Sequence, residues 1–250
     1  MRYFILSVFF LALVGCQPGE QASEEAAPET AAEEAASEAG SMDPTVTESD
    51  HYAVEFENDD VRVVRVTYAA NDETDMHSHP DLVAVFLGDG TYAFALEDGT
   101  EVERSAKAAE AIWMPAEAHA VKALIDNETI LVEIKGSGGE VEAAPEETSG
   151  ESMDPTELEP DHYKAEFEND HVRILRITYA AGDEAGLHSH PNGVLVSLSD
   201  ASAALTLEDG TEREDNFTAG DTIWAPAETH RGKATTDLEL ILIELKGSAG

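Results

Sequence analysis

Six histidines fall into two sets with the same spacing: His77, His79 and His119 in the first, and His188, His190 and His230 in the second. In each set two histidines stand one residue apart, and the third follows 40 residues after the second. Side chains at positions i and i+2 of a β-strand point to the same face, so a His-x-His strand presents two imidazoles side by side. Two imidazoles placed in this way on one strand can bind the same metal ion.

Three imidazoles can hold a divalent transition metal and leave coordination positions open. The sequence does not choose among iron, manganese, zinc, nickel and copper, because the metal at a histidine site depends on availability and geometry as much as on affinity. The competing interpretation is that the imidazoles are ordinary buried or surface groups. Two matched sets, each with a same-face pair, favour metal binding.

The elements that must position these histidines occur twice. Met-Asp-Pro-Thr at 42–45 returns at 153–156, and other segments repeat at the same offset of 111 residues. The constant offset indicates a tandem duplication without net insertion. The sequence therefore predicts domains at 51–137 and 162–248, joined by an acidic linker at 138–161.

Within each repeat the pattern is that of β-strands. Residues 61–68 are rich in β-branched side chains with interleaved charges, and residues 82–87 form an apolar run that predicts a buried strand. Asp98-Gly99 is a strong hairpin signal. We expect an all-β fold of two barrels or jelly rolls, with no apolar-striped helix in either repeat.

The histidine segments resemble the two motifs of the cupin superfamily. The first motif reads Gly, five residues, then His-x-His, which Gly182 and residues 188–190 match. The second reads Gly, five residues, Pro-x-Gly, two residues, His; Gly220, Pro226 and His230 match it with one residue fewer before the histidine. The resemblance implies a bicupin, two tandem cupin-type jelly-roll (double-stranded β-helix) barrels with one metal held by each histidine set.

The glutamate of the first cupin motif is absent from both repeats. Val83 or Ala84 stands at its position in the first, and Val194 or Leu195 in the second. Without this glutamate, the resemblance implies sites with three histidine ligands, as in cupins of the thiol dioxygenase kind. The likeness to those cupins concerns the type of ligand only.

The two repeats differ at the motif glycines. The second keeps Gly182 and Gly220, which permit tight turns beside the site. The first has Asn71 and Ala109. If only one repeat is active, we expect it to be the second.

Four glutamates are candidates for a further ligand or an acid–base group: Glu117, Glu228, Glu133 and Glu244. Glu117 and Glu228 precede the third histidine by two residues, where a water-facing turn residue is the expected role. Glu133 and Glu244 interrupt the apolar last strand. Alternation favours an outward position for them, while an inward one would bury a carboxylate that needs a partner.

The first residues predict lipid anchoring. Arg2 precedes an apolar stretch at 3–13 that is short for a membrane span. Residues 13–16, Leu-Val-Gly-Cys, resemble the lipobox of bacterial lipoproteins, which implies removal of a signal peptide and acylation of Cys16. Gln17 resembles the pattern of outer-membrane lipoproteins, so we expect the periplasmic face of that membrane. A short membrane anchor and an ordinary secretory signal are the alternatives.

The segment that follows predicts a tether. Residues 1–15 are the expected signal peptide. Residues 16–50 are rich in Ala and Glu, without an aromatic residue, and cannot bury enough apolar surface to offset their ordering entropy. We therefore expect a disordered acidic tether.

The charge and cysteine content exclude several classes of function. A net charge of −39, from 53 acidic and 14 basic residues, disfavours nucleic acid and anionic lipid surfaces as partners. Cys16 is the sole cysteine, so no disulfide forms within the chain.

Two functions agree with these observations. The first is an envelope lipoprotein whose metal sites bind a small polar ligand. The second is a metal-dependent enzyme, a dioxygenase, isomerase or decarboxylase acting on a small acid or thiol, with a non-haem dioxygenase the best fit among enzymes. A structural module with vestigial histidines is a third. The sequence leaves open whether the barrels pair within the chain or in a dimer.

Overall fold

The computed structural model describes residues 42–136 and 152–247. The predicted signal peptide, Cys16 and most of the predicted tether and linker lie outside the described residues. Among the helices that are described, none is long and apolar enough to cross a membrane.

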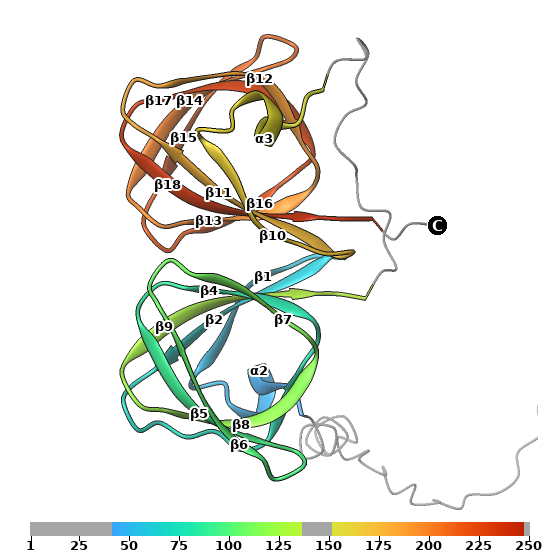
Figure 1. The fold of residues 1–250 in the computed structure, drawn as a ribbon, viewed down its shortest axis with the longest axis vertical. Coiled ribbons are helices and arrows are strands. Elements are labelled where there is room, and N and C mark those ends of the chain that lie inside the picture. Colours follow the sequence, from blue (N-terminus) through green and yellow to red (C-terminus); the bar gives the residue numbers. More distant parts are fainter. Residues whose placement is uncertain (1–41, 137–151, 248–250) are drawn as a thin grey trace, which may run out of the picture. The chain divides into compact units, whose positions relative to one another are not determined.

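The strands of the first repeat form a jelly-roll barrel of two antiparallel sheets (Figure 1). Their bounds are Tyr52–Glu57 (β1), Val61–Tyr68 (β2), His77–His79 (β3), Leu82–Phe86 (β4), Gly90–Leu96 (β5), Glu101–Ala106 (β6), Ala111–Met114 (β7), Glu117–Ala123 (β8) and Asn127–Ile134 (β9). The five-stranded sheet has the order β1-β2-β9-β4-β7, and the four-stranded sheet has the order β3-β8-β5-β6. We call these strands the first barrel.

The second repeat forms a matching barrel. Its strands are Tyr163–Glu168 (β10), Val172–Tyr179 (β11), Glu184–His190 (β12), Gly193–Ser197 (β13), Ala201–Leu207 (β14), Glu212–Phe217 (β15), Thr222–Ala225 (β16), Glu228–Ala234 (β17) and Leu238–Leu245 (β18). The sheets have the orders β10-β11-β18-β13-β16 and β12-β17-β14-β15. The predicted all-β fold of two jelly-roll barrels is confirmed.

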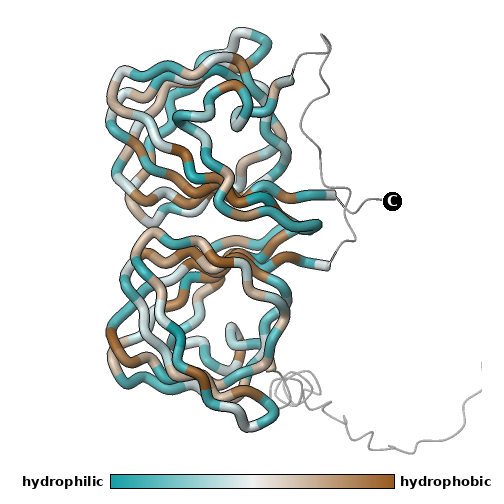
Figure 2. Tube along the Cα trace, in the orientation of Figure 1, coloured by the Kyte–Doolittle hydropathy of each residue, from teal (hydrophilic) through white to brown (hydrophobic). Residues whose placement is uncertain are grey.

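Each five-stranded sheet buries both of its faces. In β4, Leu82, Ala84 and Phe86 join the interior of the first barrel, whereas Val83 and Val85 join a separate apolar cluster on the opposite face. This double burial explains why the strand reads as a continuous apolar run. Along the trace, hydrophobic residues concentrate on the strands and hydrophilic residues at the turns (Figure 2).

That separate cluster draws on both barrels. Val63 and Val85 of the first barrel and Ile174 and Ile243 of the second belong to it, and all four are fully buried. The described residues of the two barrels accordingly belong to one compact unit. Some apolar side chains of β2 and β11 therefore pack inside their own barrel, and others pack in the shared cluster.

The turns beside the site adopt the same backbone in both repeats. Gly182 and Gly220 have φ of 96° and 89°, and Asn71 and Ala109 have φ of 76° and 68°. The loss of both glycines in the first repeat therefore does not prevent the tight turns. Asn tolerates the left-handed region, but alanine is strained there.

Part of the predicted tether is folded. Residues 44–47 form the short helix α2 (Pro44–Thr47), capped by Asp43, and the backbone N–H of Ser78 donates to the carbonyl of Met42. The end of the predicted linker likewise forms α3 (Pro155–Leu158), capped by Asp154. The predicted limits of the tether at 50 and of the linker at 161 are too far along the chain, because the aspartates bind arginines of the barrels, as described below.

Candidate metal centre

Strand pairing brings each set of histidines together. His77 and His79 lie on β3, which pairs with β8, and His77 stands directly opposite His119. The ring centroids of these three residues lie 4.9 to 5.5 Å apart. In the second barrel His188 stands opposite His230, with centroids of the triad 4.7 to 5.7 Å apart.

All six predicted ligands thus form two triads. Within each triad, one ring nitrogen from every histidine lies within 4.8 Å of the others. Five of the six side chains are buried and His230 is nearly so. We call these the first and second triads.

The hydrogen bonds of Nδ1 fix the tautomers. His77 Nδ1 lies 2.9 Å from the carbonyl oxygen of Asp75, and His79 Nδ1 lies 2.8 Å from Oε1 of Glu133. A carbonyl or carboxylate oxygen can only accept, so Nδ1 carries the proton and Nε2 keeps its lone pair. The same pattern holds in the second triad, with His188 on the carbonyl of Gly186 at 2.9 Å and His190 on Glu244 at 2.7 Å.

Glu133 is part of a buried ionic network behind the triad. Its other oxygen, Oε2, accepts from Nε of Arg62 at 2.5 Å, and Nη1 of Arg62 donates to Asp43 at 2.5 Å. Glu133 is only 1 % exposed. Arg62 compensates the buried carboxylate, which in turn orients the imidazole of His79.

The expected outward position of Glu133 and Glu244 is therefore wrong. Glu244 is also 1 % exposed and binds Arg173, which binds Asp154. Alternation failed here because β9 and β18 are buried on both faces, so neither strand has a water-facing side. The repeated Met-Asp-Pro-Thr segment was the available signal that Asp43 and Asp154 belong to the folded repeats.

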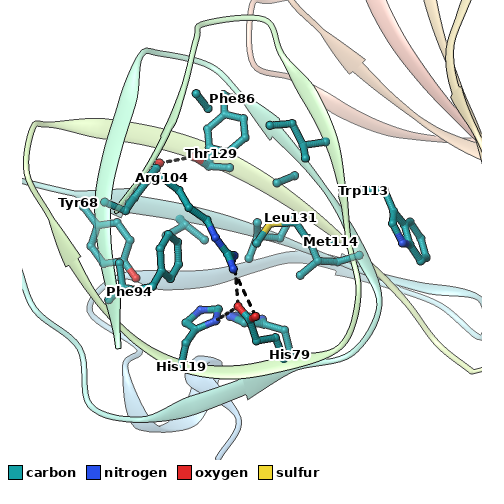
Figure 3. Close-up of a pocket in the computed structure, with 18 of the residues that line it drawn as sticks. Tyr68, His79, Phe86, Phe94, Arg104, Trp113, Met114, His119, Thr129 and Leu131 are labelled. Carbon is teal, nitrogen blue, oxygen red and sulfur yellow. Dashed lines mark hydrogen bonds and ion pairs between the residues drawn. The ribbon is translucent and has the colours of Figure 1, made fainter. Parts of the chain in front are cut away.

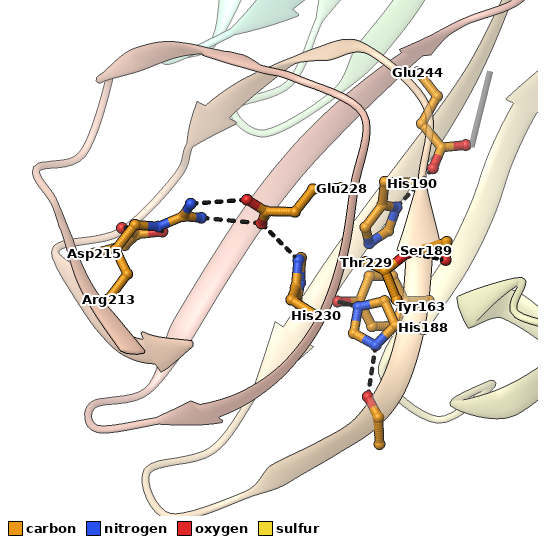
Figure 4. A network of polar contacts seen from close by, with 11 residues as sticks. Tyr163, His188, Ser189, His190, Arg213, Asp215, Glu228, Thr229, His230 and Glu244 are labelled. Atoms are coloured by element: carbon orange, nitrogen blue, oxygen red, sulfur yellow. Dashed lines mark hydrogen bonds and ion pairs between the residues drawn. The ribbon is translucent and has the colours of Figure 1, made fainter. Parts of the chain in front are cut away.

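Glu117 and Glu228 also lie behind a triad histidine, where each contacts its Nδ1. Glu228 Oε1 lies 2.9 Å from Nδ1 of His230 and forms an ion pair with Arg213 (Figure 4). Glu117 lies 3.3 Å from Nδ1 of His119. Both side chains are half-buried, so the expected water-facing turn position is only partly correct.

Burial keeps four of the six imidazoles neutral. It lowers the pKa of His77 and His230 to about 4, and that of His119 and His188 to about 3. Neighbouring imidazoles lower these values further, since two positive rings repel each other. At neutral pH these four imidazoles are therefore neutral, the state that binds a metal.

A tyrosine hydroxyl that the sequence did not single out faces each triad. Tyr52 Oη lies 3.1 Å from Nε2 of His77, and Tyr163 Oη lies 3.1 Å from Nε2 of His188. Burial raises the pKa of both tyrosines well above its usual value, so each hydroxyl keeps its proton and donates to the imidazole. Recurrence of His-Tyr at the 111-residue offset was the only sequence signal.

An apolar cavity adjoins each triad. The first has a volume of about 380 Å³, and its lining includes His79, His119, Phe94 and Leu131. Figure 3 shows these side chains around the cavity, with Arg104 extending toward the histidines. The second cavity, of about 600 Å³, includes all three histidines of its triad. Both are of the size that small-molecule sites have.

The donor set of each triad fits a divalent transition metal. Three imidazoles, each with Nδ1 held by an acceptor and Nε2 directed toward the other rings, are the ligands that such ions take, and their orienting partners are in place. His77, His79 and His119 would hold one ion, and His188, His190 and His230 another. Three protein ligands leave positions for a further molecule.

Comparison with solved structures identifies the architecture. AerE from Microcystis aeruginosa matches with a TM-score of 0.54 at 17 % identity, over 78 % of this chain and 92 % of that one. A variant of oxalate decarboxylase from Bacillus subtilis matches with a TM-score of 0.51 at 17 % identity, over 79 % and 72 %. The chain has a tandem cupin fold. No protein-family model and no curated protein matches the sequence.

The bicupin fold implied by the duplicated histidine motifs is thus confirmed. Oxalate decarboxylase is a distant relative in structure, and at 17 % identity the likeness concerns the fold alone. The ligand of this bicupin must therefore be inferred from the residues of its own sites.

Proposed function

We propose that this bicupin binds one divalent transition metal ion in each barrel and, at the open positions of that ion, a small molecule seated in the adjoining cavity. The proposal rests above all on the hydrogen-bonded triads. In both, every Nδ1 is held by a backbone carbonyl or a carboxylate, leaving three Nε2 lone pairs to converge. A pair of vestigial sites would not need this set of orienting partners twice.

In the first barrel, the carboxylates near the triad favour binding over acid–base catalysis. Glu133 is held by His79 and Arg62, and Glu117 by His119 and Arg104. Glu117 is the single carboxylate among the described residues that line the first cavity. With both groups engaged, neither is free to move a proton to or from a bound molecule.

A metal-dependent enzyme of the three-histidine type is the second candidate, and the hydroxyl of Tyr52 favours it. This protonated group lies at hydrogen-bonding distance from the Nε2 that a metal would use. A bound metal could act as a Lewis acid or an oxygen-binding site. Tyr52 would then donate to an oxygen of the bound molecule, because the lone pair of His77 would no longer be available.

Metal content of the purified full chain, measured by inductively coupled plasma mass spectrometry, tests the metal proposal. We expect two ions per chain, and one in each of the variants His77→Ala and His188→Ala. His51→Ala is the matched control, because His51 is another duplicated histidine but lies outside the triads, with Nδ1 on the carbonyl of Thr67. Absence of bound metal after reconstitution with iron, manganese, zinc, nickel and copper would reject the proposal.

We further propose that a lipid on Cys16 anchors the bicupin at the bacterial cell envelope, on the periplasmic face of the outer membrane. The support is the lipobox-like sequence at 13–16 followed by Gln17. Metabolic labelling with a radioactive fatty acid should mark the chain, and Cys16→Ser should abolish both the label and the outer-membrane fraction. Unchanged fractionation of Cys16→Ser would contradict lipid anchoring.

A further inference from the structure

The two barrels hold the same triad but differ in the space beside it. The second cavity has about 600 Å³ and the first about 380 Å³. The two barrels have the same metal ligands, orienting glutamates and tyrosines at matching positions. They therefore differ in the size of the molecule that each cavity admits.

Substitutions between the repeats account for the difference. Four positions that line both cavities carry a smaller side chain in the second barrel, and they are Tyr92 against Ala203, Phe94 against Leu205, Met114 against Ala225, and Val121 against Gly232. Leu195 and Phe217, which replace Ala84 and Ala106, fill part of the space gained. The exchange of Tyr92 for Ala203 removes a whole aromatic ring from the wall.

The second cavity also contains a polar group that is short of partners. The hydroxyl of Tyr179 is buried and, apart from its interaction with the nearby hydroxyl of Tyr163, has no hydrogen-bond partner among the residues that the structure describes. Its counterpart in the first barrel, Tyr68, is hydrogen-bonded to Tyr52. A buried hydroxyl that is short of partners is costly, so a bound molecule with an oxygen atom nearby would be favoured.

The position of Tyr179 places this oxygen close to the triad. Its ring packs edge-on against Tyr163 with centroids 6.0 Å apart, and the hydroxyl of Tyr163 reaches Nε2 of His188. The polar end of the bound molecule therefore lies between the triad and Tyr179. The remaining wall is mainly apolar and includes Leu205, Leu240 and Leu242, and it also carries charged side chains, among them Arg213, Glu214 and Lys233.

The charge of the site limits which polar group the ligand can carry. The ligand set of three histidines contains no anionic side chain, so the charge of a bound divalent cation favours an anionic group on the open positions. A polyanion would be repelled by a chain with a net charge of −39. A single carboxylate satisfies both conditions and has a second oxygen for Tyr179.

We propose that the second barrel binds an amphipathic monocarboxylate, with its carboxylate at the second triad and against the Tyr179 hydroxyl, and with an apolar body too large for the first barrel. This inference rests on the proposed metal-binding function and specifies the ligand class of one of its two sites. The first barrel takes a smaller molecule.

Calorimetric titration of the zinc-loaded full chain with straight-chain carboxylates from acetate to octanoate tests the inference. We expect one octanoate site per chain, with affinity that rises about three- to fourfold for each added methylene. His188→Ala should abolish this site, whereas His77→Ala should leave it intact. An affinity that does not depend on chain length, or a site lost with His77→Ala instead, would overturn the inference.

Two variants test the residues. Ala203→Tyr gives the second cavity the side chain of the first and should weaken octanoate at least tenfold while acetate binds as before. Tyr179→Phe keeps the volume and should weaken acetate and octanoate alike, about five- to tenfold. The matched control is Thr178→Ala, at the exposed neighbouring position of β11.

Zinc content measured on the same samples separates the two proposals. Two zinc ions per chain with no chain-length preference, or with octanoate binding unchanged in Ala203→Tyr, would reject the ligand class and leave metal binding in place. No bound zinc, and no bound iron, manganese, nickel or copper after reconstitution with these metals, would reject the proposed function itself. Two ions retained in Ala203→Tyr and Tyr179→Phe would show that these variants fold and that the lost affinity concerns the ligand.

Discussion

At the scale of single residues, hydrogen bonds to Nδ1 prepare the six imidazoles for a metal. The sequence predicted that the six histidines form two triads, because the His-x-His spacing on a strand places two imidazoles on the same face. It could not predict the buried position of Glu133 and Glu244, since alternation is informative only where one face of a strand meets water, and β9 and β18 have no such face.

Glu244→Gln should weaken metal binding at the second triad about 10- to 100-fold. Glutamine keeps the shape of the side chain and accepts from Nδ1 of His190. It removes the negative charge that orients the imidazole and makes it a more basic ligand, and it leaves Arg173 without this ionic partner. Chelator competition measures the affinity. Glu239→Gln is the control, because Glu239 also pairs with an arginine, Arg176, yet lies away from the triad. Equal affinities for the two variants would contradict an orienting role of Glu244.

The metal-free chain should lose stability as the pH falls from about 6.5 toward 4. Four triad histidines have a pKa of about 3 to 4 in the folded chain against an ordinary value of 6.5. In this window the unfolded chain binds protons that the folded chain does not, so the unfolding free energy rises with pH by up to about 1.4 kcal/mol per pH unit for each histidine.

Urea unfolding at a series of pH values measures this dependence. The contribution is complete above pH 6.5 and is lost progressively below it. His188→Gln, which removes one of the four groups, should make the dependence shallower. A stability that stays constant between about pH 5 and 6.5 would show that the imidazoles protonate in the folded chain.

At the scale of elements, the strands, their turns and the duplicated register followed from the sequence, because β-branched runs and Asp-Gly turns carry local signals. The helices α2 and α3 did not, because they have four residues each and no apolar stripe. Ion pairs from their capping aspartates to Arg62 and Arg173 hold them, and such long-range pairs leave no local pattern.

Ala109→Gly should stabilise the first barrel by about 1 kcal/mol. Ala109 has φ of 68°, a conformation that costs alanine about 1–2 kcal/mol and glycine little, although glycine loses more entropy on folding. Urea unfolding compares it with Ala108→Gly, whose position has no positive φ and which should be neutral or destabilising. Destabilisation by Ala109→Gly would contradict strain at this turn.

At the scale of the whole molecule, the outer faces of the two five-stranded sheets share one apolar cluster. Trp113 of the first barrel also stacks on Phe167 and His171 of the second, with ring centroids 6.3 Å and 5.5 Å away. The sequence showed the duplication but could not tell whether the barrels pair within the chain. An apolar strand face looks the same whether it meets its own barrel or another.

Shared burial predicts that the barrels unfold together. The two tryptophans, Trp113 and Trp224, lie one in each barrel. Trp224→Phe leaves Trp113, at the contact between the barrels, as the fluorescent probe, and Trp113→Phe leaves Trp224 in the second barrel. Their urea transitions should coincide, and Ile174→Ala, which opens a cavity in the shared cluster at a cost of about 2–5 kcal/mol, should shift both. A shift seen only by Trp224 would show that the barrels unfold independently.

The most direct measurement is anomalous diffraction from crystals of the metal-loaded chain, collected at the absorption edge of the bound metal. The account predicts two peaks, each about 2.0–2.2 Å from Nε2 of all three histidines of one triad, with Glu133 and Glu244 on Nδ1 and not on the ion. Absence of density at both triads, or a metal held by the carboxylates, would contradict the three-histidine sites on which the proposed function depends.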